Sequence, residues 1–320
     1  MRLFGRGEPA EPAPGWCSWF MPHEWVHFRT SAEAVLRDRG TPGGLDGAGN
    51  VVINDGAGNP LGVNLTGIAD DARSLQKAEW AKMIAEELEM HAHAVVERAE
   101  LVGGGSERVR SLLVPVLNLE ASTSQEYDPT VRHLGGGFVA RLGVRGLRVS
   151  TGAHVVHADD VRRWGADPNE LWAIAMHNLR RTEHEVRSVD SSGKTTYAVA
   201  GGFFNMEHLL RLDELLDTPT PYGVLVAAPR REFWLFHPIR GGHALMFAVE
   251  SFPTMIGELS NIATPFSDRI YWWAEGHLEA IAIRGTPSDG AVNFEGSQAF
   301  SDAFNGMLQA CAEDPTMLDS

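Results

Sequence analysis

The strand and turn signals between residues 138 and 181 constrain the fold of this chain more than any other stretch. Residues 138–149 (FVARLGVRGLRV) are rich in alternating and β-branched apolar residues, and glycines interrupt them. This pattern predicts two half-buried strands with a bend. Residues 154–157 (HVVH) then predict a short edge strand or connection.

A capped helix is expected directly after these strands. Asp167 is placed to accept free amide hydrogens at a helix start, Pro168 suits the first helical position, and Glu170 supplies the second half of a capping box. Apolar residues then recur at helical spacing through Arg181. The whole stretch therefore indicates hairpins followed by a single helix, and it carries no recognisable catalytic signature.

Similar turn and helix-capping signals recur along the chain. Glycine turns predict hairpins over residues 46–65 and 271–283, and a further hairpin is expected over 222–237 with its turn at residues 229–231 (PRR). Further strands are expected at 112–119, 195–200 and 244–249. Helices are expected from Thr30 or Ser31 to Gly40 and over 74–100, 205–216, 254–262 and 297–312. Regular strand-helix-strand alternation is missing, so we predict an α+β fold with a mixed, largely antiparallel sheet built from hairpins with single intervening helices, either continuous or two-lobed.

The domain organisation follows from composition. Residues 1–27 begin with a Pro-, Gly- and Glu-rich stretch and are expected to form a flexible segment. No glycine-rich linker interrupts the middle of the chain, which predicts one composite domain over 28–285, with lobes of about 28–125 and 130–285. Residues 286–320 form an added tail with a helix.

Several short segments resemble the YtpQ-like family of uncharacterised bacterial proteins. They are residues 113–117 (LVPVL), 169–181 (NELWAIAMHNLRR), 222–229 (YGVLVAAP) and the closing pair at 270–283. The similarity extends over roughly residues 60 to 283 without one diagnostic motif. It implies a cytoplasmic bacterial α+β protein and carries over no catalytic residues. The chain departs from the family in its longer glycine-rich front and in the tail after Ile283.

Charge and composition narrow the partners. The chain has 42 acidic and 27 basic residues, for a net charge of −15, which opposes binding to nucleic-acid phosphates. This acidity serves either solubility or attraction to a basic protein. The apolar runs are too short to span a bilayer and no secretion signal opens the sequence, so a cytoplasmic protein without a membrane partner is expected. The only two cysteines lack paired spacing, and no cofactor site is indicated.

One short motif has a catalytic form. Residues 23–27 (HEWVH) match the zinc-peptidase pattern, in which His23 and His27 would hold the metal and Glu24 would activate bound water. That chemistry requires both imidazoles on one helical face. The capping signal at Thr30 and Ser31 favours a helix that starts only afterwards, so an extended or irregular segment is expected here and the motif is interpreted as coincidental.

An aromatic cluster in the C-terminal half is the other candidate site. Trp234 lies in one predicted hairpin, and Tyr271, Trp272 and Trp273 lie in the next. Neighbouring tryptophans in a strand point to opposite faces, so either Trp273 faces outward or the sheet is covered on both sides. The cluster is thus core packing or, if exposed, a set of anchors for a partner protein.

Two classes of function remain open. The favoured hypothesis is a noncatalytic cytoplasmic protein that acts through protein association, as an immunity, chaperone or adaptor protein would, with Trp234, Tyr271, Trp272 and Trp273 as interaction candidates. The alternative is a zinc-dependent hydrolase that uses His23, Glu24 and His27. Metal content distinguishes the two.

Overall fold

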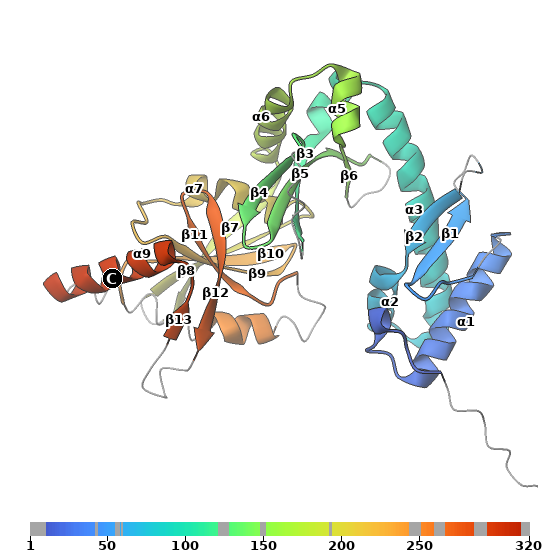
Figure 1. The fold of residues 1–320 in the computed structure, drawn as a ribbon, viewed down its shortest axis with the longest axis horizontal. Helices are drawn as coiled ribbons and strands as arrows, with labels where there is room; N and C mark the ends of the chain where they lie inside the picture. The colour runs from blue at the N-terminus through green and yellow to red at the C-terminus, as the bar shows by residue number, and fades with distance from the viewer. Residues whose placement is uncertain are drawn as a thin grey trace, which may run out of the picture. The chain divides into compact units, whose positions relative to one another are not determined.

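The chain forms two compact units. The computed structural model describes residues 11–41, 44–54, 58, 60–120, 128–147, 152–191, 194–242, 251–258, 266–284 and 293–314. Unit 1 comprises residues 1–103 and 146–150, and unit 2 comprises residues 104–145 and 151–320 (Figure 1). The lobes expected from the sequence place the boundary later in the chain.

Unit 1 is a small helical unit with one hairpin. In chain order its elements are η1 (Gly15–Cys17), α1 (Pro22–Asp38), β1 (Asn50–Asn54), β2 (Pro60–Asn64), α2 (Thr66–Ala72), η2 (Lys77–Glu79) and α3 (Trp80–Gly103). Strands β1 and β2 pair antiparallel, which confirms the predicted hairpin. Helix α3 ends at the first of three consecutive glycines, as expected.

Helix α1 corrects the sequence-based expectation for residues 23–27. The segment is helical because Pro22 occupies the first position and Glu24 accepts a hydrogen bond from the Met21 amide at 3.1 Å. Thr30, expected to start the helix, lies inside it and donates its hydroxyl to the Val26 carbonyl. Residues 22–27 are therefore part of a packed helix rather than of a flexible segment.

Aromatic packing explains why this helix begins early. Phe20, Phe28 and Trp80 are buried and their ring centroids lie 5.3 to 6.0 Å apart. Trp25 is also buried and stacks beside Phe28. Burying each large ring contributes roughly 1.5–3 kcal/mol. This outweighs the differences in helix propensity between ordinary residues, which are about a few tenths of a kcal/mol. Tertiary packing, and not local capping alone, sets the helix start.

Unit 2 contains two antiparallel sheets. Its first part comprises α4 (Ser106–Val109), η3 (Arg110–Leu112), β3 (Leu113–Leu119), β4 (Val131–Gly135), β5 (Phe138–Arg145), β6 (Ala153–Val155), α5 (Ala158–Trp164) and α6 (Pro168–Leu179). Strands β7 (His184–Ser191), β8 (Lys194–Gly201), β9 (Val224–Arg230), β10 (Phe233–Pro238), β11 (Ile270–Ala274), β12 (His277–Arg284) and β13 (Asn293–Glu295) build the larger sheet. Helices η4 (Met206–Arg211), α7 (Leu212–Leu215) and α9 (Gln298–Glu313), together with helical residues 251–258, complete the unit.

The larger sheet runs β13-β12-β11-β9-β10-β8-β7, and every recorded pair in it is antiparallel. Strand β9 lies at its centre, and six of its seven residues are buried. A strand covered on both faces needs a nearly continuous apolar run, which the sequence of β9 supplies. The α+β class and the hairpin-built antiparallel sheet are thus confirmed.

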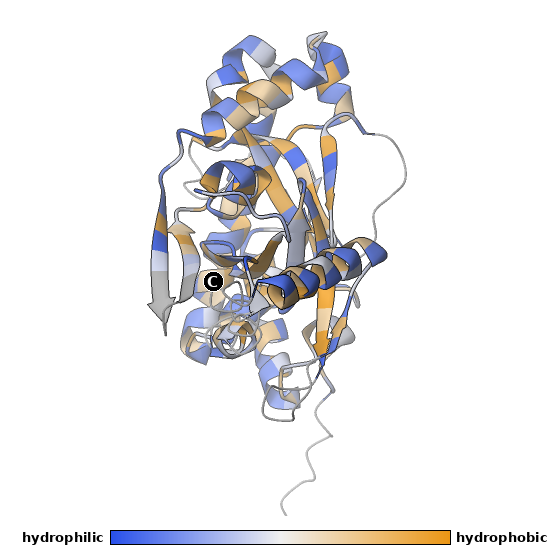
Figure 2. Ribbon diagram, turned by 90° about the vertical axis from the view of Figure 1, so that its left-hand side faces the viewer, coloured by the Kyte–Doolittle hydropathy of each residue, from blue (hydrophilic) through white to orange (hydrophobic). Residues whose placement is uncertain are grey.

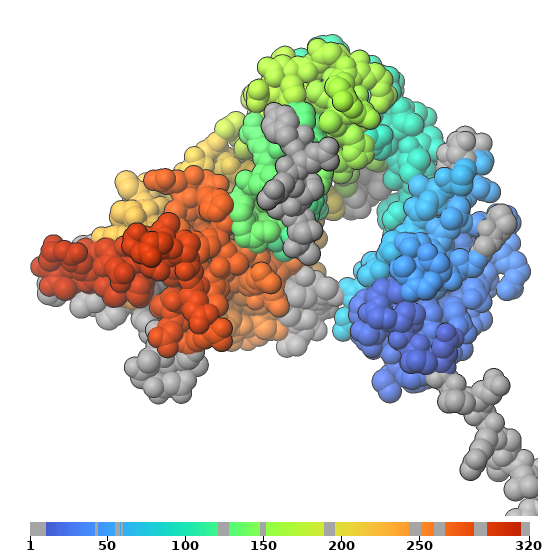
Figure 3. Space-filling model, viewed as in Figure 1, coloured from blue at the N-terminus to red at the C-terminus, as the bar shows by residue number. Residues whose placement is uncertain are grey.

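Helix α9 covers one end of this sheet. Phe300 contacts Trp272 with ring centroids 5.5 Å apart, and Met307 and Cys311 are buried on the same helix face. Figure 2 shows polar and apolar residues mixed along α9, and Figure 3 shows the helix, in red, against the orange strands. Leu308, expected on the packed face, is 46% exposed. The C-terminal helix is therefore docked on its own chain.

Other local predictions meet mixed outcomes. Asp167 caps α6 by accepting from the Asn169 amide at 2.9 Å, as expected, whereas Glu170 pairs with Arg110 instead of closing a capping box. Residues 138–145 form one strand, not two, and its hairpin partner is β4. Strand β7 was not predicted, and residues 244–249 lie outside the described residues.

Candidate functional site

Two of the three residues of the zinc-peptidase pattern, Glu24 and His27, make contacts within unit 1, whereas His23 is exposed on helix α1. Glu24 accepts from the Met21 amide and forms an ion pair with Lys77 at 3.3 Å; the backbone hydrogen bond lowers the pKa of its carboxyl. The Nε2 atom of His27 donates to the Lys77 carbonyl at 3.1 Å, and its ring packs on Trp80. Across the described part of the chain, no three His, Cys, Asp or Glu side chains are grouped as a metal site would require. Helix α1 gives the two histidines the helical spacing of the motif, but the contacts of Glu24 and His27 stabilise the fold of unit 1.

The four aromatic candidates are buried. Trp234 is fully buried, Tyr271 is 1% exposed, and Trp272 and Trp273 are 7% and 8% exposed. Trp234 donates its indole N–H to the Asn205 carbonyl, and Trp272 donates to that of Tyr222. The burial agrees with the interpretation of these rings as core packing and leaves none of the four as an exposed anchor. Trp273 lines a pocket in unit 2.

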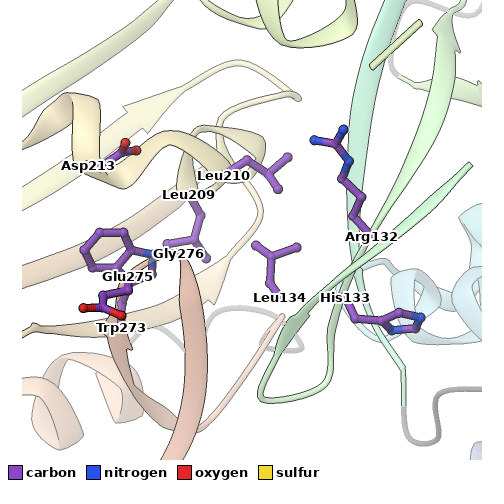
Figure 4. Close-up of a pocket in the computed structure, with 9 residues that line it drawn as sticks. All are labelled: Arg132, His133, Leu134, Leu209, Leu210, Asp213, Trp273, Glu275 and Gly276. Atoms are coloured by element: carbon purple, nitrogen blue, oxygen red, sulfur yellow. The ribbon is translucent and has the colours of Figure 1, made fainter. Parts of the chain in front are cut away.

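That pocket is a hollow of about 400 Å³ in unit 2. Its walls come from strand β4, the η4–α7 segment and the β11–β12 hairpin. The lining residues are Arg132, His133, Leu134, Leu209, Leu210, Asp213, Trp273, Glu275 and Gly276 (Figure 4). Three elements that are far apart in sequence thus meet around one cavity.

Close backbone packing holds β4 in this position. Gly135 has φ +88°, and a Cβ atom there would lie 2.2 Å from the Leu278 carbonyl oxygen of β12. Only glycine fits such a conformation and approach. On the opposite wall, Glu275 and Gly276 both have positive φ, 49° and 81°, as a type I′ turn requires. The predicted Glu275–Gly276 turn is confirmed, and it fixes where the Glu275 side chain starts.

The charged side chains lie at opposite ends of the pocket. Figure 4 shows Asp213, Trp273 and Glu275 at one end and Arg132 at the other, with leucines 134, 209 and 210 between them. The side chain of His133 points away from these leucines, as strand alternation requires. The pocket therefore has an apolar middle with a negative and a positive end.

In the described part of the chain, the charges at the two ends of the pocket have no partner at ion-pair distance, although Asp213 interacts electrostatically with Arg180. Within the described ranges, Arg132, Asp213 and Glu275 form no ion pair within 4 Å. The Cζ atom of Arg132 instead lies over the Trp172 ring, 4.4 Å from its centroid, and desolvation lowers the pKa of Arg132. Such charges keep their hydrogen-bonding capacity for a ligand.

A histidine pair supports the η4–α7 segment. His208 is fully buried and its ring stacks on that of His184, with centroids 4.0 Å apart. Arg211 donates to Nδ1 of His208 and to Nε2 of His184, both at 2.9 Å. An arginine can only donate, so both of these ring nitrogens must be unprotonated acceptors. The opposite nitrogen of His208 bonds the Thr182 hydroxyl at 2.9 Å.

This arrangement requires neutral imidazoles. Burial, reinforced by His184 and Arg211, lowers the pKa of His208 from 6.5 to about 3. Glu214 completes the network by accepting from Arg211 at 2.9 Å and from Arg180 at 3.0 Å, and these bonds lower its pKa to about 2. The histidine pair is thus a fully bonded structural element.

A buried ion pair fixes the start of the same segment. Glu207 is fully buried, and its Oε1 atom accepts from Arg231 at 2.6 Å and from the Leu117 amide at 3.0 Å. Arg231 also donates to the Leu117 carbonyl. Desolvation raises the pKa of Glu207, and Arg231 opposes that shift. These bonds connect η4 to strand β3 and so position Leu209 and Leu210 of η4, which line the pocket.

Sequence reasoning missed these residues. It predicted an amphipathic helix over 205–216 with Met206, Leu209 and Leu210 inward, and Met206 and Leu209 are indeed buried. An amphipathic helix has a single apolar face, so this prediction gave the charged residues between them no place in the core. The sequence feature that could have indicated buried charges is the high density of charged and histidine residues at 206–214 (MEHLLRLDE).

Comparisons with known proteins give no family. No family model matches the chain, and neither a curated protein nor a solved structure shows significant similarity to it. The resemblance to the YtpQ-like family therefore stays a sequence-based prediction. In the described residues, no helix is both long and apolar enough to cross a membrane.

Proposed function

We propose that this chain is a noncatalytic bacterial cytoplasmic protein that acts by association with another protein, and that the unit 2 pocket receives a segment of that partner. Immunity, chaperone and adaptor roles all share this mode of action. The cytoplasmic and bacterial parts of the proposal rest on the sequence resemblance.

One observation carries the proposal: a solvent-open pocket whose charged ends are unpaired while the charges behind it are paired. Arg132 and the carboxylates of Asp213 and Glu275 flank an apolar floor, whereas Glu207 and Arg211 on the supporting segment are bonded. Unpaired charges on a concave surface with an apolar centre are typical of a recognition site. The positioning network also keeps the floor rigid, which reduces the entropy lost on binding.

Site-specific crosslinking tests the proposal. A photoreactive amino acid at Leu210, which is half-buried in the pocket wall, should capture one partner protein in cells of the source organism. Capture should fall strongly when Asp213 and Glu275 are both replaced by lysine, because the negative end is then reversed.

A matched charge reversal serves as the control. Glu86 and Asp159 lie outside the pocket, with side chains 67% and 76% exposed. The Glu86→Lys and Asp159→Lys double variant carries the same change in net charge and should still be captured. Equal capture by both double variants, or capture that ignores the pocket substitutions, would refute the proposed site.

A further inference from the structure

We propose that the pocket recognises a basic side chain of the partner at the Asp213–Glu275 end and an acidic side chain of the same segment at Arg132. This inference rests on the proposed function and names the chemistry of the segment. It commits the pocket to a segment that carries a lysine or arginine and, on the same segment, an aspartate or glutamate.

The negative end suits a cation. Asp213 and Glu275 are both exposed, and in Figure 4 the Trp273 ring is drawn between their carboxylates. A lysine or arginine head group there gains two carboxylate partners and an aromatic neighbour, and cation–π contacts favour tryptophan. The Glu275 backbone is held by the tight turn, so this end is already ordered before binding.

The apolar middle suits the stem of the same side chain. Leu134 is 7% exposed and Leu209 is 1% exposed, so they present a firm apolar floor. Lysine and arginine carry aliphatic stems that cover apolar surface while the charged head reaches a polar group. A short acidic side chain offers no comparable stem at this end.

The positive end suits a carboxylate. The Cζ atom of Arg132 lies over the Trp172 ring, 4.4 Å from its centroid, and the guanidinium N–H groups bond no carboxylate in the parts of the chain that the structure describes. A planar guanidinium binds a carboxylate with two parallel hydrogen bonds. The contact with Trp172 holds the guanidinium at this end of the pocket while its N–H groups stay without a carboxylate partner.

Overall charge favours the same partner. The chain carries a net charge of −15, which attracts a basic protein and repels an acidic one over distances near the Debye length. Arg132 then adds local selectivity, because a purely basic segment would place a positive charge against it. Long-range and local electrostatics therefore select a basic partner with one acidic residue at the site.

Short synthetic peptides test this chemistry. The probes are acetylated, amidated peptides in which one lysine and one glutamate are separated by one to three alanine or leucine residues. Matched probes replace lysine by norleucine or glutamate by glutamine. Binding is followed by the indole N–H signal of Trp273 in the full-length protein, assigned with Trp273→Phe.

The expected pattern is a pair of specific losses. Norleucine should weaken binding to the native protein about three- to fivefold, and the Asp213→Asn, Glu275→Gln double variant should remove the difference between lysine and norleucine. Arg132→Gln should instead remove the difference between glutamate and glutamine. Glu86→Gln is the control and should preserve both differences.

The outcomes separate this inference from the proposed function. If crosslinking at Leu210 remains charge-dependent but the peptides show no preference for lysine, the assignment of the basic side chain is wrong and the proposed function stands. If crosslinking ignores the pocket charges, both fall. Crosslinks between two copies of this chain would replace the partner with a second copy and overturn the inference.

Discussion

The η4–α7 segment presents two contrasting sets of charges. Toward the core, Glu207 and Arg211 are bonded to Arg231, to the histidine pair and to Glu214. Toward the pocket, Asp213 has no ion pair in the described residues, and it shares the cavity with Arg132 and Glu275. Both sets come from a short stretch of sequence, so residue type alone does not tell a structural charge from a recognition charge. The two kinds of charge are distinguished by whether the side chain is buried and whether it has a bonded partner.

This contrast implies a division of labour that can be tested by substitution. Removing one member of a buried, bonded pair leaves an uncompensated charge in a medium of low polarity, and the cost is large. Removing an exposed, unpaired charge leaves nothing uncompensated, so stability should hardly change. Binding should show the reverse order of effects.

The largest effect is expected from Glu207→Ala. The substitution leaves the partly buried Arg231 without its carboxylate and deprives the buried Leu117 amide of its acceptor, which should lower the free energy of unfolding of unit 2 by about 3 kcal/mol. Pulse proteolysis in urea, with mass-spectrometric detection of β3 and β10 peptides, measures the change. Glu185→Ala removes an exposed partner of Arg187 and should leave the midpoint unchanged within error. Equal midpoints for Glu207→Ala and the native protein would show that the pair is not structural.

An intermediate effect is expected from pH at His208. The folded pKa of about 3 lies below the ordinary 6.5, so between these values the unfolded chain binds more protons and stability falls as pH falls. The slope is up to about 1.4 kcal/mol per pH unit for one histidine. Glu207 acts in the opposite direction because its pKa is raised, and Glu214 adds to the loss only below about pH 4.5.

The comparison with His208→Gln isolates this histidine. Glutamine accepts from Arg211 and donates to Thr182 without titrating, so contributions from other groups cancel in the difference between the two proteins. Urea unfolding followed by circular dichroism from pH 7 to pH 4.5 should show the native protein losing stability relative to the variant. Parallel curves would mean that the imidazole is not held neutral by the fold.

The smallest stability effect is expected at the pocket rim. Asp213→Asn and Glu275→Gln should each change the free energy of unfolding by no more than about 0.5 kcal/mol. Arg132→Gln also loses the contact with Trp172 and should cost about 1 kcal/mol at most. The same urea experiment measures this. A loss comparable with that of Glu207→Ala would assign the rim to the structural set and remove the contrast between the two sets.

Local sequence signals predicted much of the fold. Asp167 at a helix start and the Glu275–Gly276 turn were identified because both depend on short-range backbone geometry. Strand β9 was identified because a buried central strand must be apolar throughout. These features need no knowledge of distant residues.

The errors arose where distant contacts decide. Residues 23–27 were expected to be nonhelical, but α1 begins at Pro22, and Phe28 of this helix packs against Phe20 and Trp80. Strand β7 (HEVRSVDS) lacks a strong apolar pattern because it lies at the edge of the sheet, where pairing with β8 supplies the order.

The candidate site was beyond sequence reasoning for a related cause. Arg132, Asp213 and Glu275 come from three separate elements, and nothing in their local patterns signals that they meet. The tryptophans that the sequence suggested as partner anchors, Trp234, Trp272 and Trp273, are instead buried rings of the core.

Unit 1 also takes in a piece of chain from beyond its own helices. Glu97 of α3 is 2% exposed, and its Oε1 atom accepts from the amide of Leu147 at 2.7 Å, within the returning residues 146–150. A gene fragment that stops at Gly103 would encode every helix and strand of the unit and still lack that amide. During synthesis, this contact waits until the ribosome has made β3, β4 and β5.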